Sequence, residues 1–183
     1  ITGTSGSGKD TIMASVIRAL PGVRKAVTAV TRESRSGEIH GQDHYFLSAT
    51  EFDDWLREGR FVEWANVYGR RYGTPKSEIK DHLLNGTDVI LRVDVQGARS
   101  IMGVFDSAVV IFVRPESIAA GLERLTDRDT DGEMAVKLRI ATAKEELKFC
   151  KQADYVIENK TGCVNNAVAQ VIGIIHSERK KSL

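Results

Sequence analysis

The stretch Gly3-Thr4-Ser5-Gly6-Ser7-Gly8-Lys9-Asp10-Thr11 decides how the rest of the chain is interpreted. It matches the pattern G-x-x-x-x-G-K of a phosphate-binding loop and departs from it at Asp10, where Ser or Thr is usual. Its glycines allow a tight turn with inward-pointing N–H groups, and the N-terminus of a following helix adds positive potential. We therefore expect the loop to bind phosphates, through Gly3, Ser5, Gly6, Ser7, Gly8, Lys9, Asp10 and Thr11.

A flexible linker is the alternative interpretation of so many glycines and serines. A linker, however, has no reason to carry a lysine at this spacing, followed by a helical pattern of apolar residues at Ile12, Val16, Ile17 and Leu20. Lys9 supplies a positive charge for the terminal phosphates of a nucleotide.

The composition limits the classes of partner. The 183 residues include 26 basic and 25 acidic side chains, so bulk charge does not predict a nucleic-acid partner. No apolar run approaches the roughly 20 residues of a membrane span. Cys150 and Cys163 have no metal-binding spacing and are typical of a reduced cytoplasmic protein.

Apolar runs predict strands at 27–30, 89–91, 109–113 and 155–157, and alternation predicts a hairpin of 61–67 with 70–73. Helices are expected at 11–20, from a cap at Thr50 to Gly59, from a cap at Thr74 to Asn85, and at 115–125, 133–149 and 162–176. The charged link 126–132 suits a mobile lid. Strands that alternate with helices predict an α/β fold with a parallel sheet, helices on both faces and ligands at the carboxyl ends of the strands.

From Thr31 onwards the chain resembles the guanylate kinase family, P-loop kinases of nucleoside monophosphates. The similarity begins with Thr31-Arg32-x-x-Arg35-x-Gly37-Glu38-x-x-Gly41-x-Asp43. Further motifs follow in the family's order, namely Phe61-Val-Glu-Trp-Ala65, Tyr72-Gly73-Thr74-Pro75, Asp94-Val-Gln-Gly-Ala98, Arg124-Leu125, Arg128-x-Thr130 and Asn159.

The resemblance implies a P-loop NTPase core at about 1–30, 87–125 and 150–183, a strand-rich GMP-binding lobe at about 31–86 and a helical lid at about 126–149. It implies transfer of the γ-phosphoryl group of ATP to GMP, with Mg²⁺ bound alongside ATP and held through Asp10 and Thr11. No other metal, nucleic acid or membrane is expected as a partner.

The resemblance also assigns roles to individual residues. Catalysis falls to Lys9, Arg35, Arg128 and Arg139, and Asn159 joins the loop in binding ATP. Glu63 accepts hydrogen bonds from N1–H and the exocyclic amine of guanine, and Glu38 orients the phosphate-binding arginines. The complete set predicted to bind GMP is Thr28, Arg32, Arg35, Glu38, His44, Glu63, Tyr72, Thr74 and Asp94.

Three residues depart from the family pattern. Asp10 follows the loop lysine, Arg92 replaces the first aspartate of a D-x-D motif, and His44 stands where the family has a phosphate-contacting tyrosine. We hypothesise that Asp10 and Arg92 are two halves of one exchange and interact.

Two other functions stay open on the sequence alone. A ribose 1,5-bisphosphate phosphokinase shares the Gly-Ser-Gly-Lys-Asp of the phosphate loop but does not need Glu63. A binding-only guanylate-kinase-like module is expected to lose the loop lysine or the lid arginines, yet Lys9, Arg128 and Arg139 are present.

Overall fold

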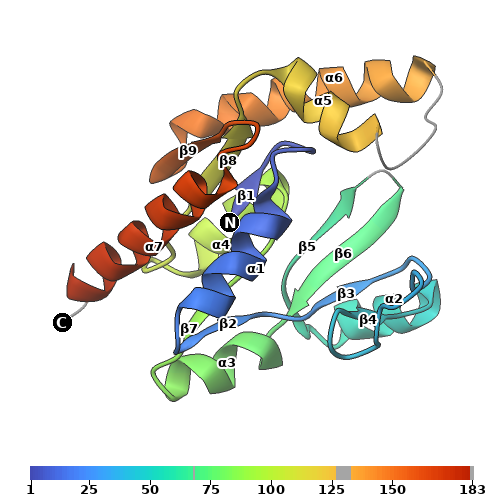
Figure 1. Ribbon diagram of the computed structural model, residues 1–183. Coiled ribbons are helices and arrows are strands. Elements are labelled where there is room, and N and C mark those ends of the chain that lie inside the picture. The colour runs from blue at the N-terminus through green and yellow to red at the C-terminus, as the bar shows by residue number, and fades with distance from the viewer. Residues whose placement is uncertain (68, 127–132, 182–183) are drawn as a thin grey trace. The chain divides into compact units, whose positions relative to one another are not determined.

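The computed structural model describes residues 1–67, 69–126 and 133–181, which fall into two compact units (Figure 1). The first unit consists of Ile1–Pro21 with Ser107–Leu183, and the second of Gly22–Asp106. The predicted division into core, GMP-binding lobe and lid is based on function rather than on compactness, and it stays a prediction.

The first unit is a parallel sheet of order β1-β8-β9 with helices packed on it. Its elements are β1 (Thr2–Gly3), α1 (Lys9–Ala19), β8 (Ile111–Pro115), α5 (Ile118–Thr126), α6 (Glu133–Leu147), the 3₁₀ turn Lys148–Lys151, β9 (Tyr155–Asn159) and α7 (Val164–Lys181). The predicted α/β class with a parallel sheet is confirmed. Because all three strands run in the same direction, the loop after β1 and the residues after β9 lie at the same edge of the sheet.

The core of this unit forms where strand and helix side chains meet. Phe112 and Val113 of β8, Phe149 of the 3₁₀ turn and Val171 of α7 are all fully buried. The rings of Phe112 and Phe149 lie 6.0 Å apart between their centroids. A continuous apolar run of this kind is what a strand covered on both faces requires.

The second unit contains two sheets. Its elements are β2 (Val23–Lys25), β3 (Thr28–Val30), β4 (His44–Phe46), α2 (Ala49–Arg57), β5 (Phe61–Val67), β6 (Arg70–Pro75), α3 (Ser77–Leu84), β7 (Asp88–Ile90) and α4 (Val95–Val104). One sheet pairs β2 with β7 in parallel, and the other has the order β4-β3-β6-β5. The predicted hairpin is confirmed as the antiparallel pair of β5 and β6.

A small aromatic core holds α2 against the four-stranded sheet. Phe52 of α2 is fully buried and stacks on Phe61 of β5, with 4.6 Å between ring centroids. Ala29 and Leu47 complete this cluster. The sheet therefore has one apolar face fixed by α2, which leaves other positions of the same strands to carry polar side chains.

Three predicted element boundaries are wrong. The cap of α2 is Ser48 rather than Thr50, because Ser48 and Glu51 exchange both bonds of a full capping box. Thr74 does not cap a helix, since β6 continues through it to Pro75 and α3 follows an N-cap at Lys76. Pro115 ends β8 instead of opening α5, which begins at Ile118.

Short strands are the elements that the sequence pattern missed. β2 and β4 have three residues each and no continuous apolar run, so periodicity gives no signal for them. Within the described part of the chain, no helix has the length and apolar character needed to cross a membrane.

Candidate active site

The phosphate loop joins β1 to α1 in the first unit. The backbone N–H of Ser7 donates to the carbonyl of Thr4 at 3.1 Å, which closes a tight turn. Gly8 is the N-cap of α1 in the left-handed conformation, and Lys9 is the first residue of the helix. The Lys9 ammonium lies 3.4 Å from the carbonyl oxygen of Thr4, so the side chain folds back over the loop. This arrangement directs a helix N-terminus and a lysine towards one anion.

Glycine is required in this loop because other backbone and side-chain groups approach it closely. A Cβ on Gly6 would lie 2.0 Å from the carbonyl oxygen of Gly121 in α5, and one on Gly8 would lie 2.4 Å from Nδ2 of Asn159. The Asn159 amide donates to the carbonyl of Ser7 at 2.9 Å. Asn159, predicted to bind ATP, therefore supports the loop directly from the end of β9.

An ion-pair network that sequence analysis did not assign to the site also supports the loop. Arg124 of α5 donates to the carbonyls of Gly6 at 3.4 Å and Asn159 at 3.0 Å, and it pairs with Glu116. The Glu116 carboxylate accepts further bonds from Thr161, and these bonds hold its pKa at about 2. The only sequence signal for this network was the position of Arg124 in the Arg124-Leu125 motif.

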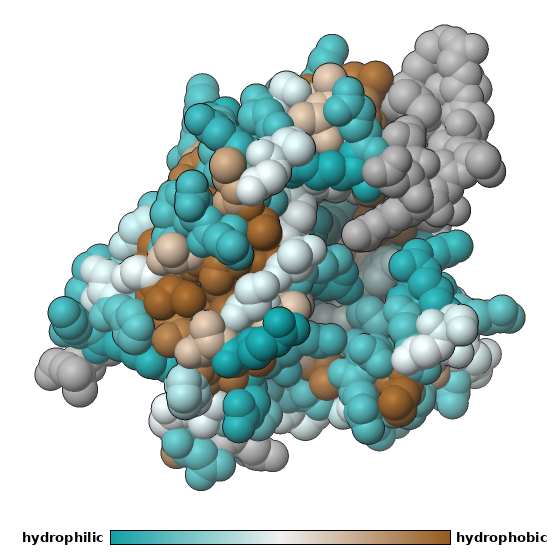
Figure 2. Space-filling model, in the orientation of Figure 1, coloured by the Kyte–Doolittle hydropathy of each residue, from teal (hydrophilic) through white to brown (hydrophobic). Residues whose placement is uncertain are grey.

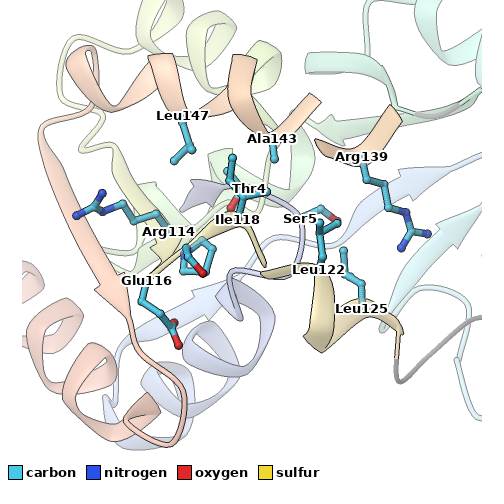
Figure 3. A pocket seen from close by; sticks show the side chains of 12 residues that line it. Thr4, Ser5, Arg114, Glu116, Ile118, Leu122, Leu125, Arg139, Ala143 and Leu147 are labelled. Carbon is cyan, nitrogen blue, oxygen red and sulfur yellow. The ribbon is translucent and has the colours of Figure 1, made fainter. Parts of the chain in front are cut away.

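A cavity of about 70 Å³ lies beside the loop, lined by residues of the loop, the end of β8, α5 and α6. Its apolar side consists of leucines from both helices together with Ile118 and Ala143. Figure 3 shows Arg139 and Ser5 at one end, with Arg114 and Glu116 at the other. The structure thus brings the predicted catalytic Arg139 to the same cavity as the phosphate loop. Arg128 and the link 127–132 lie outside the described residues.

The first turn of α1 carries the oxygen donors expected to hold Mg²⁺. Asp10 and Thr11 directly follow Lys9, and both are exposed. Carboxylate and hydroxyl oxygens are hard ligands that suit Mg²⁺, which keeps several waters and needs few protein groups. These residues therefore fit the ion. Among the residues that the structure describes, no group of three or more His, Cys, Asp or Glu forms a protein-only metal site.

Buried polar side chains in the second unit come together on neighbouring strands. Thr28 of β3 is the register partner of His44 of β4, and the Thr28 hydroxyl lies 2.8 Å from Nδ1 of His44. Glu63 of β5 is the register partner of Thr74 of β6, and the Thr74 hydroxyl donates to the Glu63 carboxylate at 2.5 Å. At most 6% of each of these four residues is exposed. Buried polar groups this concentrated are unusual in a structural sheet and indicate a binding site.

The carboxylate of Glu63 is fixed by its surroundings. Burial raises the pKa of Glu63. The hydrogen bond from Thr74 lowers this pKa, and the negative charge of Asp94 raises it further. A Cβ on Gly97 of α4 would lie 2.5 Å from Oε2 of Glu63, so only glycine leaves room for the carboxylate there. Asp94 caps α4 by accepting from the Gly97 N–H at 2.8 Å. The β5 carboxylate thus lies against the first turn of α4, at a glycine of the Asp94-Val-Gln-Gly-Ala98 motif to which the sequence assigned no role.

Arg32 and Glu38 form a bidentate ion pair in the loop between β3 and β4. The two nitrogens of the Arg32 guanidinium lie 2.5 and 2.6 Å from the two Glu38 oxygens. Glu38 also accepts from the backbone N–H of Arg35 at 2.7 Å. Together these bonds hold the pKa of Glu38 at about 2. The predicted orienting contact of Glu38 is present for the side chain of Arg32 and for the backbone of Arg35.

Tyr72, which was predicted to bind GMP, and Tyr45 take distinct positions in this unit. Tyr72 lies close enough to Arg32 to affect the pKa of that guanidinium. Tyr45 donates to Glu78 of α3 at 2.7 Å, so it does not replace the tyrosine that His44 displaces. Figure 2 shows that the drawn face over β3, β4 and α2 is mostly hydrophilic.

Asp10 belongs to the first unit and Arg92 to the second, and their predicted interaction stays a prediction.

Comparisons with known proteins all lead to one family. The sequence model of the guanylate kinase family matches residues 1–178. The guanylate kinase of Gloeobacter violaceus is 40% identical over 173 residues, which cover 94% of this chain and 84% of that protein. That of Thermotoga maritima is 39% identical over 181 residues, covering 99% and 86%. The crystal structure of guanylate kinase from Anaplasma phagocytophilum aligns with a TM-score of 0.79 at 29% identity, covering 97% of this chain and 84% of that one.

Proposed function

Because the chain belongs to the guanylate kinase family, we propose that it transfers the γ-phosphoryl group of ATP to GMP, giving ADP and GDP. The observation that supports this reaction most strongly is the buried carboxylate of Glu63, fixed by Thr74 and tightly packed against Gly97. A carboxylate there pairs with the N1–H and exocyclic amine of guanine. Adenine does not offer these two donors side by side, so the site selects guanine.

Transfer of a phosphoryl group depends mainly on positioning and on neutralising charge. The phosphate loop and Asn159 hold the ATP phosphates, and Lys9 provides a positive charge near the group that is transferred. Arg35, Arg128 and Arg139 neutralise the charge that develops in the transition state. The position of Arg139 at the cavity beside Ser5 supports its part in this set.

The acceptor is bound through side chains of the second unit. Arg32, Arg35, His44 and Tyr72 contact the GMP phosphate, and Glu38 keeps the Arg32 fork in a fixed plane. Thr28 lies beside the base with Glu63, and Thr74 and Asp94 complete that end of the site. In this proposal the phosphate and the guanine of one nucleotide lie over neighbouring strands of one sheet.

Mg²⁺ is the cofactor that this reaction needs, and Asp10 and Thr11 would hold it together with the ATP phosphates. When bound, the ion offsets charge on the β- and γ-phosphates. Asp10 would repel phosphate by itself, so its carboxylate is best explained as a ligand of the cation.

Cys150 and Cys163 are free thiols, which supports a reducing, cytoplasmic location.

A coupled assay for ADP tests the proposal against both alternatives. With ATP and Mg²⁺, the protein is offered GMP, dGMP, AMP or ribose 1,5-bisphosphate at equal concentration. Rapid turnover with GMP and negligible turnover with AMP and ribose 1,5-bisphosphate is expected. Preferential use of the bisphosphate would make the chain the other kinase. Tight GMP binding without any turnover would make it a binding module.

A further inference from the structure

Arg92 has no role in the site described so far, although it lies in the same unit as the acceptor residues. β7 pairs with β2, and the N–H of Ala26 donates to the carbonyl of Ile90 at 3.1 Å, so the residue after β2 is still bonded to the last residue of β7. Two residues further along, these chains reach Thr28 and Arg92. The backbone of Arg92 is thus two residues from a bond to the segment that leads into Thr28.

Thr28 in turn fixes the position of His44. The two are register partners on β3 and β4, and Nδ1 of His44 lies 2.8 Å from the Thr28 hydroxyl. The partly buried Arg92 is therefore a short stretch of chain from the segment that leads to Thr28, the partner of this buried imidazole. This placement follows from hydrogen bonds of the backbone and does not depend on the side-chain conformation of Arg92.

The electrostatics of His44 show where the Arg92 side chain extends. Burial and, in decreasing order, the charges of Arg92, Arg32 and Lys25 together lower the pKa of His44 to about 4. Among these charges that of Arg92 makes the largest contribution, so its guanidinium lies within range of a charge interaction with the imidazole. Glu38, paired with Arg32, is the carboxylate that faces this group from the loop before β4.

His44 is neutral at physiological pH under these conditions. A neutral imidazole with Nδ1 bonded to Thr28 can give a phosphate at most one hydrogen bond from Nε2 and no positive charge. A guanidinium next to it offers both charge and a planar fork of donors, the geometry that phosphate prefers. Arg92 and Arg32 approach His44 from different segments of the chain, one after β7 and one after β3.

We propose that Arg92 is a binding residue for the phosphate of the acceptor nucleotide, acting with Arg32 on either side of His44. This inference rests on the proposed function. It makes the acceptor site of this chain a site of three arginines, Arg32, Arg35 and Arg92. It also gives a reason for a positive side chain after β7, in place of the aspartate of the family pattern.

Binding of two ligands that differ only in the phosphate tests this proposal. Dissociation constants of GMP and guanosine are measured by calorimetry, or by competition where binding is weak, for the wild type, Arg92→Ala and Arg92→Lys. Arg24→Ala is the matched control, because Arg24 is an exposed arginine on β2, the strand that pairs with β7. Thermal unfolding checks that each variant is folded.

Arg92→Ala should weaken GMP binding about 10- to 100-fold, the usual loss for a charge-assisted bond, and leave guanosine binding within about twofold. Arg92→Lys should recover part of the loss, and Arg24→Ala should have no effect. Equal weakening of GMP and guanosine would assign Arg92 a structural role and overturn the proposal. Unchanged GMP binding in Arg92→Ala would also overturn it. If wild-type protein does not bind GMP at all, the proposed function fails instead.

Discussion

The two units of this protein build their binding sites in different ways. The phosphate loop of the first unit is made mainly of backbone, with Gly6 and Gly8 in left-handed conformations that a helix and Asn159 press against. The acceptor site proposed for the second unit is made of side chains that pair across strands, such as Thr28 with His44 and Thr74 with Glu63.

This difference decides what each site can recognise. Backbone N–H groups and a helix N-terminus bind any phosphate chain and contain little information about a base. A buried carboxylate with a fixed partner distinguishes one base from another, because a wrong base leaves it unpaired. Substitutions in the loop should therefore affect ATP and catalysis, and substitutions on the sheet should affect GMP.

The largest expected effect is on the rate and comes from the loop lysine. Lys9→Met removes the charge that we propose acts on the transferring group and should lower kcat about 100- to 1000-fold, with GMP binding retained. Steady-state kinetics measure kcat, and calorimetry measures the affinity for GMP. The control is Lys151→Met, an exposed lysine of the same unit. A variant that loses GMP binding as strongly as its rate would break the distinction between the two sites.

A loop made of backbone should be sensitive to a single methyl group. Gly6 and Gly162 share a φ of 75°, but a Cβ on Gly6 would lie 2.0 Å from the Gly121 carbonyl oxygen, whereas nothing lies within 4 Å of one on Gly162. Gly162→Ala should cost about 1–2 kcal/mol of unfolding free energy from its backbone conformation alone. Gly6→Ala should cost more and should abolish ATP binding. Equal losses in urea unfolding would contradict the close packing of the loop.

A methyl group on α4 makes the corresponding test of the acceptor site. A Cβ on Gly97 would displace the Glu63 carboxylate, and we expect Gly97→Ala to raise the KM for GMP about 10- to 100-fold without changing that for ATP. Gly103→Ala is the matched control on the same helix, with nothing within 4 Å of its new methyl group. If both variants have the KM of the wild type, Gly97 does not position Glu63.

The smallest effect concerns stability and pH. The Arg32 pair holds the pKa of Glu38 at about 2, below the ordinary 4.5 of the unfolded chain. Its stabilising contribution is therefore complete above pH 4.5 and decreases as the pH falls towards 2. The difference in unfolding free energy between wild type and Glu38→Gln should decrease over this range in urea titrations. A difference in unfolding free energy that does not vary with pH would show that Glu38 is not held as a paired carboxylate.

The sequence predicted what depends on local pattern. The phosphate loop, the β5–β6 hairpin and the family were all read correctly, because glycine spacing, alternation and ordered motifs are local signals. The capping of α2 was misread since Thr50-x-x-Asp53 and Ser48-x-x-Glu51 are two overlapping versions of one pattern. A choice between them depends on where the chain enters the helix.

Contacts between distant segments could not be predicted from the sequence. The approach of Gly97 to Glu63, the bond of Arg124 to the Gly6 carbonyl and the effect of Arg92 on His44 all join segments far apart in sequence. No spacing rule connects such residues, because only the pairing of strands and helices brings them together. Thr74 illustrates this limit, since its place opposite Glu63 made it a strand residue rather than a helix cap.

The most direct test of base recognition compares GMP with inosine monophosphate, which lacks only the exocyclic amine. If Glu63 is the acceptor for that amine, wild-type protein should prefer GMP by about 100-fold in kcat/KM. In Glu63→Gln this preference should decrease to a few-fold, with the KM for ATP unchanged. A preference for GMP that stays the same in Glu63→Gln would contradict the account of the acceptor site.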